Sequence, residues 1–255
     1  MATVRSGDVR IHYEVTGHGP PIVLVHGFSS SFERDWRQNG WIDFLVDDGR
    51  QVIGLDLRGH GSSGKPHSPE AYAANQIPDD VLAVMDSLGI ERGDVMGYSM
   101  GALVTLNLLA RRPDRFSSAV VGGTGLPRAS TGPNPKLAVA LEAPNAAGIS
   151  DPAELRFRQA VERRGNDLLA LAAFQRSHRT QAEAEALRQL ELPLLVVVGA
   201  DDEVAASARD LAALVRGAEL VMLADEDHQS ALAAEGYKQA VRRFLRAGHE
   251  RLVPA

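Results

Sequence analysis

The chain has 255 residues, 44% of them hydrophobic and 24% charged, and its net charge of −6 lacks the basic surface that a nucleic-acid partner requires. The absence of cysteine excludes disulfide bonds, a thiolate nucleophile and a cysteine-bound zinc site. Because residues 1–15 lack the apolar core of a signal peptide and no apolar run is long enough to cross a bilayer, we expect a cytoplasmic location and no membrane partner.

In the first half of the chain, short β-type runs alternate with helical patterns. Residues 9–15 alternate polar and apolar side chains, as in a half-buried strand, whereas the later runs are continuously apolar, as in strands covered on both faces. The predicted strands cover residues 9–15, 21–25, 51–55, 93–96 and 119–121, and the predicted helices cover 36–46, 77–88 and 100–111.

The alternation stops at residues 122–135, which are rich in Gly, Pro, Ser and Thr and indicate a long connection. From there to residue 189 the pattern is helical, and strand and helix patterns then resume. This order predicts an α/β fold with a mostly parallel central sheet and helices on both faces. The remaining predictions are strands at 194–198 and 220–223, helices at 207–215 and 229–245, a core of residues 1–125 and 189–255, and a small helical cap at 126–188.

The sharpest motif is Gly97-Tyr98-Ser99-Met100-Gly101, between a predicted strand and a predicted helix. Such a turn strains its central residue and leaves little room for flanking side chains, which explains the two glycines. The turn lifts the Ser99 hydroxyl clear of the sheet, and the helix N-terminus directs free N–H groups towards a developing oxyanion. The motif therefore predicts Ser99 as a nucleophile. The competing interpretation is a plain strand-to-helix turn that carries a serine.

Together with two further motifs, this turn makes the chain resemble the α/β-hydrolase fold superfamily over essentially its whole length. His26-Gly27-Phe28 follows a predicted strand, as the oxyanion-hole motif of that family does. Residues 56–63, Asp-Leu-Arg-Gly-His-Gly-Ser-Ser, are similar to its D-x-R-G-x-G-x-S loop. The resemblance implies the α/β-hydrolase fold and a Ser, Asp, His triad in that chain order, acting on a small-molecule substrate without a cofactor or a metal.

By the same resemblance, the base follows the last strand, which selects His228 among the eight histidines. The family usually has glycine directly before this histidine, whereas this chain has Asp227. The acid stands three residues after Gly199, which selects Asp202, with Asp201 as the nearest rival. The competing interpretation is that either aspartate is a turn residue or a helix N-cap.

The remaining predicted site groups surround the nucleophile. The elbow geometry makes the backbone N–H of Met100 one oxyanion donor, and the resemblance assigns the N–H of Phe28 as the other. The helical insertion is expected to form a modest apolar pocket that suits a small or medium acyl group, although its apolar residues would equally serve helix packing. The candidate substrate-binding residues are Tyr98, Leu137, Leu141, Phe157, Leu171 and Phe174.

A serine at the elbow points to acyl transfer, because haloalkane dehalogenases and epoxide hydrolases of this family carry aspartate in place of Ser99. The favoured activity is cleavage of an ester or related acyl bond, and the alternatives with the same triad are carbon–carbon bond hydrolysis and enol-lactone hydrolysis. Haloperoxidase-like esterases tend to have tryptophan soon after the His-Gly pair, where this chain has three serines at 29–31. From another class, a non-hydrolytic biosynthetic enzyme or a ligand-binding protein would use the same cavity.

Overall fold

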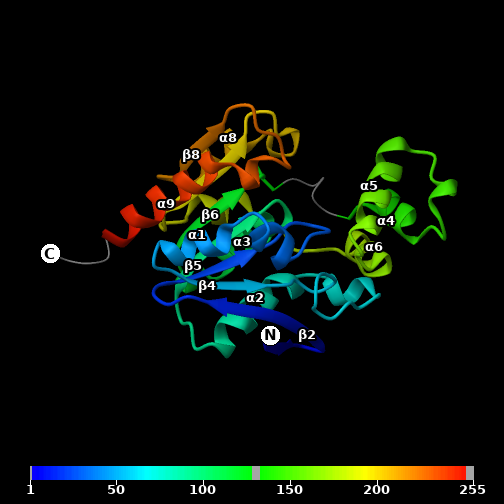
Figure 1. Cartoon of the computed structure of the whole chain (residues 1–255), viewed down its shortest axis with the longest axis horizontal. Helices are drawn as coiled ribbons and strands as arrows, with labels where there is room; N and C mark the ends of the chain where they lie inside the picture. Colours follow the sequence, from blue (N-terminus) through cyan, green and yellow to red (C-terminus); the bar gives the residue numbers. More distant parts are fainter. Residues whose placement is uncertain (1, 128–132, 251–255) are drawn as a thin grey trace.

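The computed structural model describes residues 2–127 and 133–250, and its strands within them form one sheet of eight (Figure 1). The order across the sheet is β1-β2-β4-β3-β5-β6-β7-β8. The β1–β2 and β2–β4 pairs are antiparallel and the other pairs are parallel, which confirms the predicted mostly parallel sheet. The strands are β1 (Ala2–Ser6), β2 (Val9–Thr16), β3 (Pro21–Val25), β4 (Gln51–Leu55), β5 (Gly93–Tyr98), β6 (Phe116–Gly122), β7 (Leu194–Gly199) and β8 (Glu219–Leu223).

Helices cover both faces of this sheet, as predicted. Helices α1 and α9 pack on one face, and α2, α3, α7 and α8 pack on the other. Alternate residues of a buried strand therefore point into different cores: Val23 and Val25 face α2 and α3, whereas Ile22 and Leu24 face α1 and α9. These helices are α1 (Trp41–Asp47), α2 (Gln76–Ser87), α3 (Met100–Arg111), α7 (Ala184–Arg188), α8 (Ala208–Leu214) and α9 (Glu235–Glu250).

Three further helices, α4 (Pro135–Glu142), α5 (Pro152–Arg163) and α6 (Leu168–Arg176), lie to one side of the sheet in Figure 1. We call them the α4–α6 group. They bury a small apolar core of their own, and each begins at a residue whose side chain caps it. Helix α7, also within the predicted cap, packs instead on α3 and α8. Residues 128–132 of the predicted cap lie outside the described residues.

Two elements differ from the sequence prediction for local reasons. The helix predicted at 36–46 is divided into a π-helical turn, Glu33–Arg37, and α1, because Gly40 between them has a φ of 70°. Strand β1 was not predicted, because it is a largely exposed edge strand that pairs only with β2. Strand β1 lies at the far edge of the sheet from the predicted site residues, whereas the π-helical turn contacts the loop that follows β3.

Candidate active site

Ser99 occupies the turn between β5 and α3 with backbone angles φ 54° and ψ −115°. A non-glycine residue with positive φ stores about 1–3 kcal/mol of strain, which the surrounding packing must hold. A Cβ atom at Gly97 would overlap the carbonyl oxygen of Gly101, and one at Gly101 would overlap the carbonyl oxygen of Val25. Both flanking positions therefore require glycine, and the strained turn presents the Ser99 side chain at the carboxyl end of β5.

Ser99, His228 and Asp202 come from three separate loops and form one hydrogen-bonded chain. His228 Nε2 lies 3.0 Å from Ser99 Oγ, and His228 Nδ1 lies 2.9 Å from Asp202 Oδ2. The Asp202 side chain is fully buried, whereas that of His228 is 20% exposed. Because a carboxylate can only accept, His228 carries its proton on Nδ1 and offers the Nε2 lone pair to the Ser99 hydroxyl. This is the arrangement that general-base activation of a serine requires.

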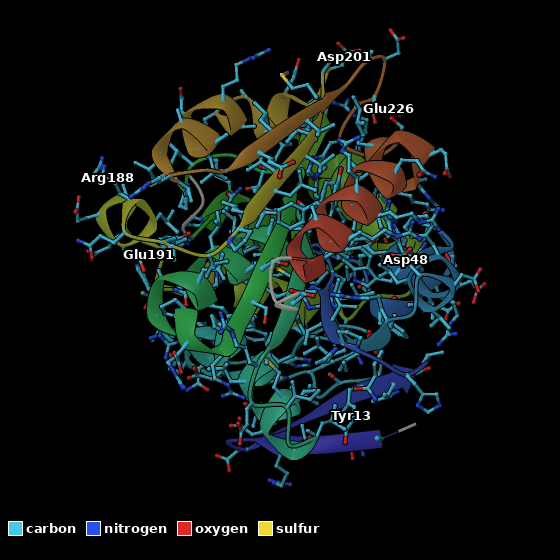
Figure 2. All side chains as sticks on the ribbon, turned by 90° about the vertical axis from the view of Figure 1, so that its left-hand side faces the viewer. Tyr13, Asp48, Arg188, Glu191, Asp201 and Glu226 are labelled. Carbon is cyan, nitrogen blue, oxygen red and sulfur yellow. The ribbon has the colours of Figure 1, made fainter. Side chains whose placement is uncertain are left out.

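The structure separates the two candidate acids. Asp202 faces His228 and also caps the short turn Glu203–Ala205, because its Oδ1 atom accepts the N–H groups of Val204 at 2.9 Å and Ala205 at 3.1 Å. Asp201 is exposed, and its own N–H donates to the Glu226 carbonyl oxygen at 3.0 Å. Figure 2 shows Asp201 and Glu226 together at the outer end of the sheet. Asp202 is therefore the candidate acid that contacts His228, and its side chain also caps a turn.

Asp227, which stands where the family usually has glycine, folds the loop that carries the base. Its Oδ1 atom accepts the N–H groups of Gln229 at 2.8 Å and Ser230 at 2.9 Å, and these backbone hydrogen bonds lower the pKa of the Asp227 carboxyl. On the inner side, the Tyr98 hydroxyl donates to the His228 carbonyl oxygen at 2.8 Å. The loop that carries His228 is thus held by hydrogen bonds from Asp227 and from Tyr98.

The predicted oxyanion donor Phe28 lies in a tight turn. The Ser30 N–H donates to the Gly27 carbonyl oxygen at 3.3 Å, and the Ser29 N–H donates to His60 Nε2 at 3.2 Å. The backbone N–H groups of Phe28 and Met100 have no hydrogen-bond partner within residues 2–127 and 133–250. Since Phe28, Met100 and Ser99 line the same cavity, both N–H groups are available near the nucleophile.

His60 serves this turn as a neutral acceptor. It is buried, and burial lowers its pKa from 6.5 to about 3. Its Nδ1 atom lies 3.0 Å from the Arg58 carbonyl oxygen, which can only accept, so Nδ1 carries the proton and Nε2 is left to accept from Ser29. From the opposite direction, Asn166 Nδ2 donates to the Ser29 carbonyl oxygen at 3.1 Å. The turn is therefore tied both to the loop at 56–63 and to the segment between α5 and α6.

A cavity of about 470 Å³ opens beside Ser99. One wall is the face of α3 that carries Leu103, Val104 and Asn107, and the wall from α6 includes Phe174. Several other lining groups are polar, so the cavity is less apolar than the sequence led us to expect. They are Thr124, Asn134, Gln175, Arg179, Thr180, Gln181, Glu203 and Ser207.

The structure divides the candidate substrate-binding residues. Phe174 lines the cavity, whereas Leu141 and Leu171 lie in the apolar core of the α4–α6 group, and the partly buried Leu137 and Phe157 pack against that core. A group of three short helices has too little surface against the sheet to bury all its apolar side chains there, so the helices bury them against one another. Tyr98 also lies outside the cavity lining, since it is buried beneath the loop that carries His228.

Most residues of the cavity lining were not predicted from the sequence, and Asn107 and Arg179 are two examples. Helical spacing could have identified Asn107, because residues 99, 103 and 107 lie at i, i+4 and i+8 along one face of the helix. Arg179 gives no such signal, because it follows α6 in an irregular segment. Its guanidinium lies 3.9 Å from the centroid of the Phe174 ring, and burial lowers its pKa to about 10.

Among the described side chains, those of residues 2–127 and 133–248, there is no group of three or more His, Asp or Glu arranged to hold a metal ion. Each helix in residues 2–127 and 133–250 is too short or too polar to cross a membrane.

Comparison with known proteins places this geometry in context. Residues 20–149 match the family model described as alpha/beta hydrolase fold. Epoxide hydrolase 3 of Siraitia grosvenorii is 33% identical over 118 residues, which are 46% of this chain and 36% of that protein, so the match spans about a third of the relative. A hydrolase from Pseudomonas aeruginosa PA01 has a TM-score of 0.78 and 26% identity, covering 95% of this chain and 97% of that one. The enol-lactonase from Burkholderia xenovorans LB400 has a TM-score of 0.77 and 25% identity, covering 96% and 100%.

Proposed function

The chain belongs to the α/β-hydrolase fold family, and within it we propose that the protein cleaves an ester or a related acyl bond of a small or medium-sized molecule. The observation that carries the proposal is the hydrogen-bonded chain from Asp202 through His228 to Ser99. A serine hydroxyl needs a base within hydrogen-bond reach to become an effective nucleophile, and the base needs an orienting acid.

In the proposed reaction, Ser99 Oγ attacks the carbonyl carbon while His228 Nε2 takes the hydroxyl proton. Asp202 stabilises the resulting imidazolium, and the N–H groups of Phe28 and Met100 bind the oxyanion. The tetrahedral intermediate collapses, and His228 gives its proton to the departing alcohol. A water molecule, deprotonated by His228, then attacks the acyl-enzyme. The bond between Ser99 Oγ and the acyl carbon breaks, His228 returns its proton to Ser99 Oγ, and the acid and the free enzyme are released.

The identity of the elbow residue supports acyl transfer over epoxide opening. The curated relatives named epoxide hydrolases match between 45% and 53% of this chain, and the family resemblance places aspartate at the elbow in such enzymes. The serine hydroxyl here must lose a proton as it attacks, and His228 is hydrogen-bonded to it for that purpose. A cavity of about 470 Å³ with a mixed lining suits a compact substrate that carries polar groups.

A lactone is the second candidate substrate. The structural similarity to the Burkholderia xenovorans enol-lactonase covers that whole chain, and a lactone is an intramolecular ester that the same steps would open. The triad and the oxyanion donors would act identically. The difference is that the alcohol formed by acylation stays attached to the acyl group.

A fluorophosphonate probe tests the proposal without knowledge of the natural substrate. We expect it to label Ser99 in the wild-type protein, as read by peptide mass spectrometry, and to leave Ser99→Ala unlabelled. A panel of 4-nitrophenyl esters and lactones should be turned over by the wild type and not by Ser99→Ala. Absence of labelling in the folded wild type, or turnover that persists in Ser99→Ala, would refute the serine mechanism. Labelling without turnover of any panel member would favour the ligand-binding alternative.

A further inference from the structure

Asp35, in the π-helical turn that precedes α1, contacts the loop that carries Phe28. Its Oδ2 atom accepts the Gly27 N–H at 2.8 Å, and its Oδ1 atom accepts the Ser30 hydroxyl. One half-buried carboxylate thus binds both the first and the last residue of the turn at 27–30. None of the steps of the proposed reaction uses Asp35, and nothing in its sequence context singles it out.

The turn that Asp35 holds has an unfavourable backbone. Ser29, at its third position, has a φ of 58°, whereas Phe28, at its second, is not among the positive-φ residues. A positive φ at the third position alone defines a type II turn, which normally places glycine or asparagine there. A type II turn with serine at this position is strained, so contacts with residues outside the turn must stabilise it. As in any β-turn, the N–H of the second residue, here Phe28, takes no part in the hydrogen bond that closes the turn.

Asp35 also lies near the nucleophile. A Cβ atom built on Gly27 would be 3.4 Å from Asp35 Oδ2 and 3.5 Å from the Cβ atom of Ser99. Gly27 is therefore close to both the carboxylate and the serine. Any shift of the Gly27 N–H away from Asp35 moves the next peptide N–H, that of Phe28, relative to Ser99.

We propose that Asp35 is a positioning residue for the oxyanion hole, which sets the place of the Phe28 N–H through its hydrogen bond to the Gly27 N–H. The inference rests on the proposed function, because it assumes an oxyanion formed at Ser99. An oxyanion donor is effective only at about 2.7–3.1 Å from the place where the negative charge develops. A displaced turn therefore weakens transition-state binding more than ground-state binding, and the effect falls on kcat rather than on KM.

Two substitutions of similar shape separate hydrogen bonding from packing. Asp35→Asn keeps an oxygen that accepts the Gly27 N–H, and its amide group can donate to the Ser30 hydroxyl oxygen. Asp35→Leu fills the same space without an acceptor. Asp35→Ala is a further variant should the leucine variant not fold, and Asp43→Ala, an exposed carboxylate of α1, is the matched control. Thermal unfolding of each variant reports whether the fold is retained.

The measurements are kcat and KM with 4-nitrophenyl butyrate, and the rate of Ser99 labelling by the fluorophosphonate. For Asp35→Leu we expect kcat and the labelling rate to fall about 10- to 100-fold, whereas KM should stay within about twofold of the wild-type value. This decrease in kcat is at most as large as the decrease caused by removing a whole oxyanion donor. Asp35→Asn should stay within about threefold of the wild type, and Asp43→Ala should match it. For Asp35→Ala we expect the same decreases in kcat and labelling rate as for Asp35→Leu.

Three outcomes overturn the inference: a leucine variant as active as the wild type, an asparagine variant as impaired as the leucine variant, or a loss confined to KM. Failure of the proposed function has a different signature, because the wild type itself would then be neither labelled at Ser99 nor active on the ester. A labelled and active wild type with an equally active Asp35→Leu counts against the positioning role alone.

Discussion

Asp202 Oδ2 lies 2.9 Å from His228 Nδ1, while Oδ1 of the same carboxylate binds two backbone N–H groups of the turn that follows. The carboxylate cannot rotate towards solvent without losing three hydrogen bonds. Its side chain is fully buried, so its charge acts on the imidazole with little screening by water. This one contact fixes the tautomer of His228 and its direction towards Ser99.

The first prediction concerns this contact. In Asp202→Asn, the amide oxygen keeps the backbone hydrogen bonds and the NH2 group faces the imidazole. Nδ1 must then accept, so the proton moves to Nε2 and that atom can no longer take the proton of Ser99. We expect kcat for 4-nitrophenyl butyrate to fall about 10³- to 10⁴-fold, as the loss of the correct tautomer does in serine proteases.

Asp201→Asn is the matched control, since Asp201 is the exposed neighbour whose side chain is not bonded to His228. We expect its kcat to stay within about twofold of the wild type, as for other surface substitutions. Equal losses in the two variants would show that the acid has been assigned incorrectly.

The second prediction concerns His60 and pH. Burial lowers the pKa of His60 from 6.5 to about 3, so the folded protein keeps it neutral while the unfolded chain protonates it. Because the unfolded state binds more protons between these values, the free energy of unfolding decreases as pH falls through that window. Through this one group, the free energy of unfolding should decrease by about 2 kcal/mol between pH 6.5 and pH 5, since each pH unit contributes at most about 1.4 kcal/mol.

Urea unfolding at pH 7 and pH 5 measures this effect in the wild type and in His60→Gln, whose side-chain oxygen can accept the Ser29 N–H without titrating. We expect the glutamine variant to lose about 2 kcal/mol less than the wild type between the two pH values. His18→Gln, at an exposed histidine, should keep the wild-type pH dependence. If His60→Gln lost as much stability on acidification as the wild type, His60 would not be the titrating group.

The third prediction separates the residues that line the cavity from those inside the α4–α6 group. Leu103→Trp narrows the cavity beside Ser99, whereas Leu137→Trp enlarges a residue packed against the core of the helical group. We expect Leu103→Trp to lower the ratio of kcat/KM for 4-nitrophenyl octanoate over acetate by about tenfold or more. Leu137→Trp should leave that ratio within about twofold of the wild-type value. A shift in the ratio for Leu137→Trp as large as for Leu103→Trp would restore the original pocket prediction.

Secondary structure was predicted best where a local pattern and clear ends coincide. Strands β3 and β4 and helix α3 have the predicted bounds, because their apolar runs lie between glycine, proline or polar residues. Helix α9 begins at Glu235 rather than at residue 229, because residues 231–233 form a separate short turn that ends at the extended Ala234. Periodicity alone does not distinguish such a turn from the first turn of a helix.

The sequence alone determined the turn that presents Ser99, because Gly97 and Gly101 are required by contacts within that turn and with the adjacent strand. It also limited the base and the acid to a few positions at strand ends. Only the tertiary structure decided that Asp202 rather than Asp201 faces His228, and that Phe174 rather than the neighbouring leucines lines the cavity. The physical reason is that glycine requirements arise from local backbone overlap, whereas a hydrogen bond between residues 26 positions apart, or the face that a short helix buries, depends on how distant elements pack.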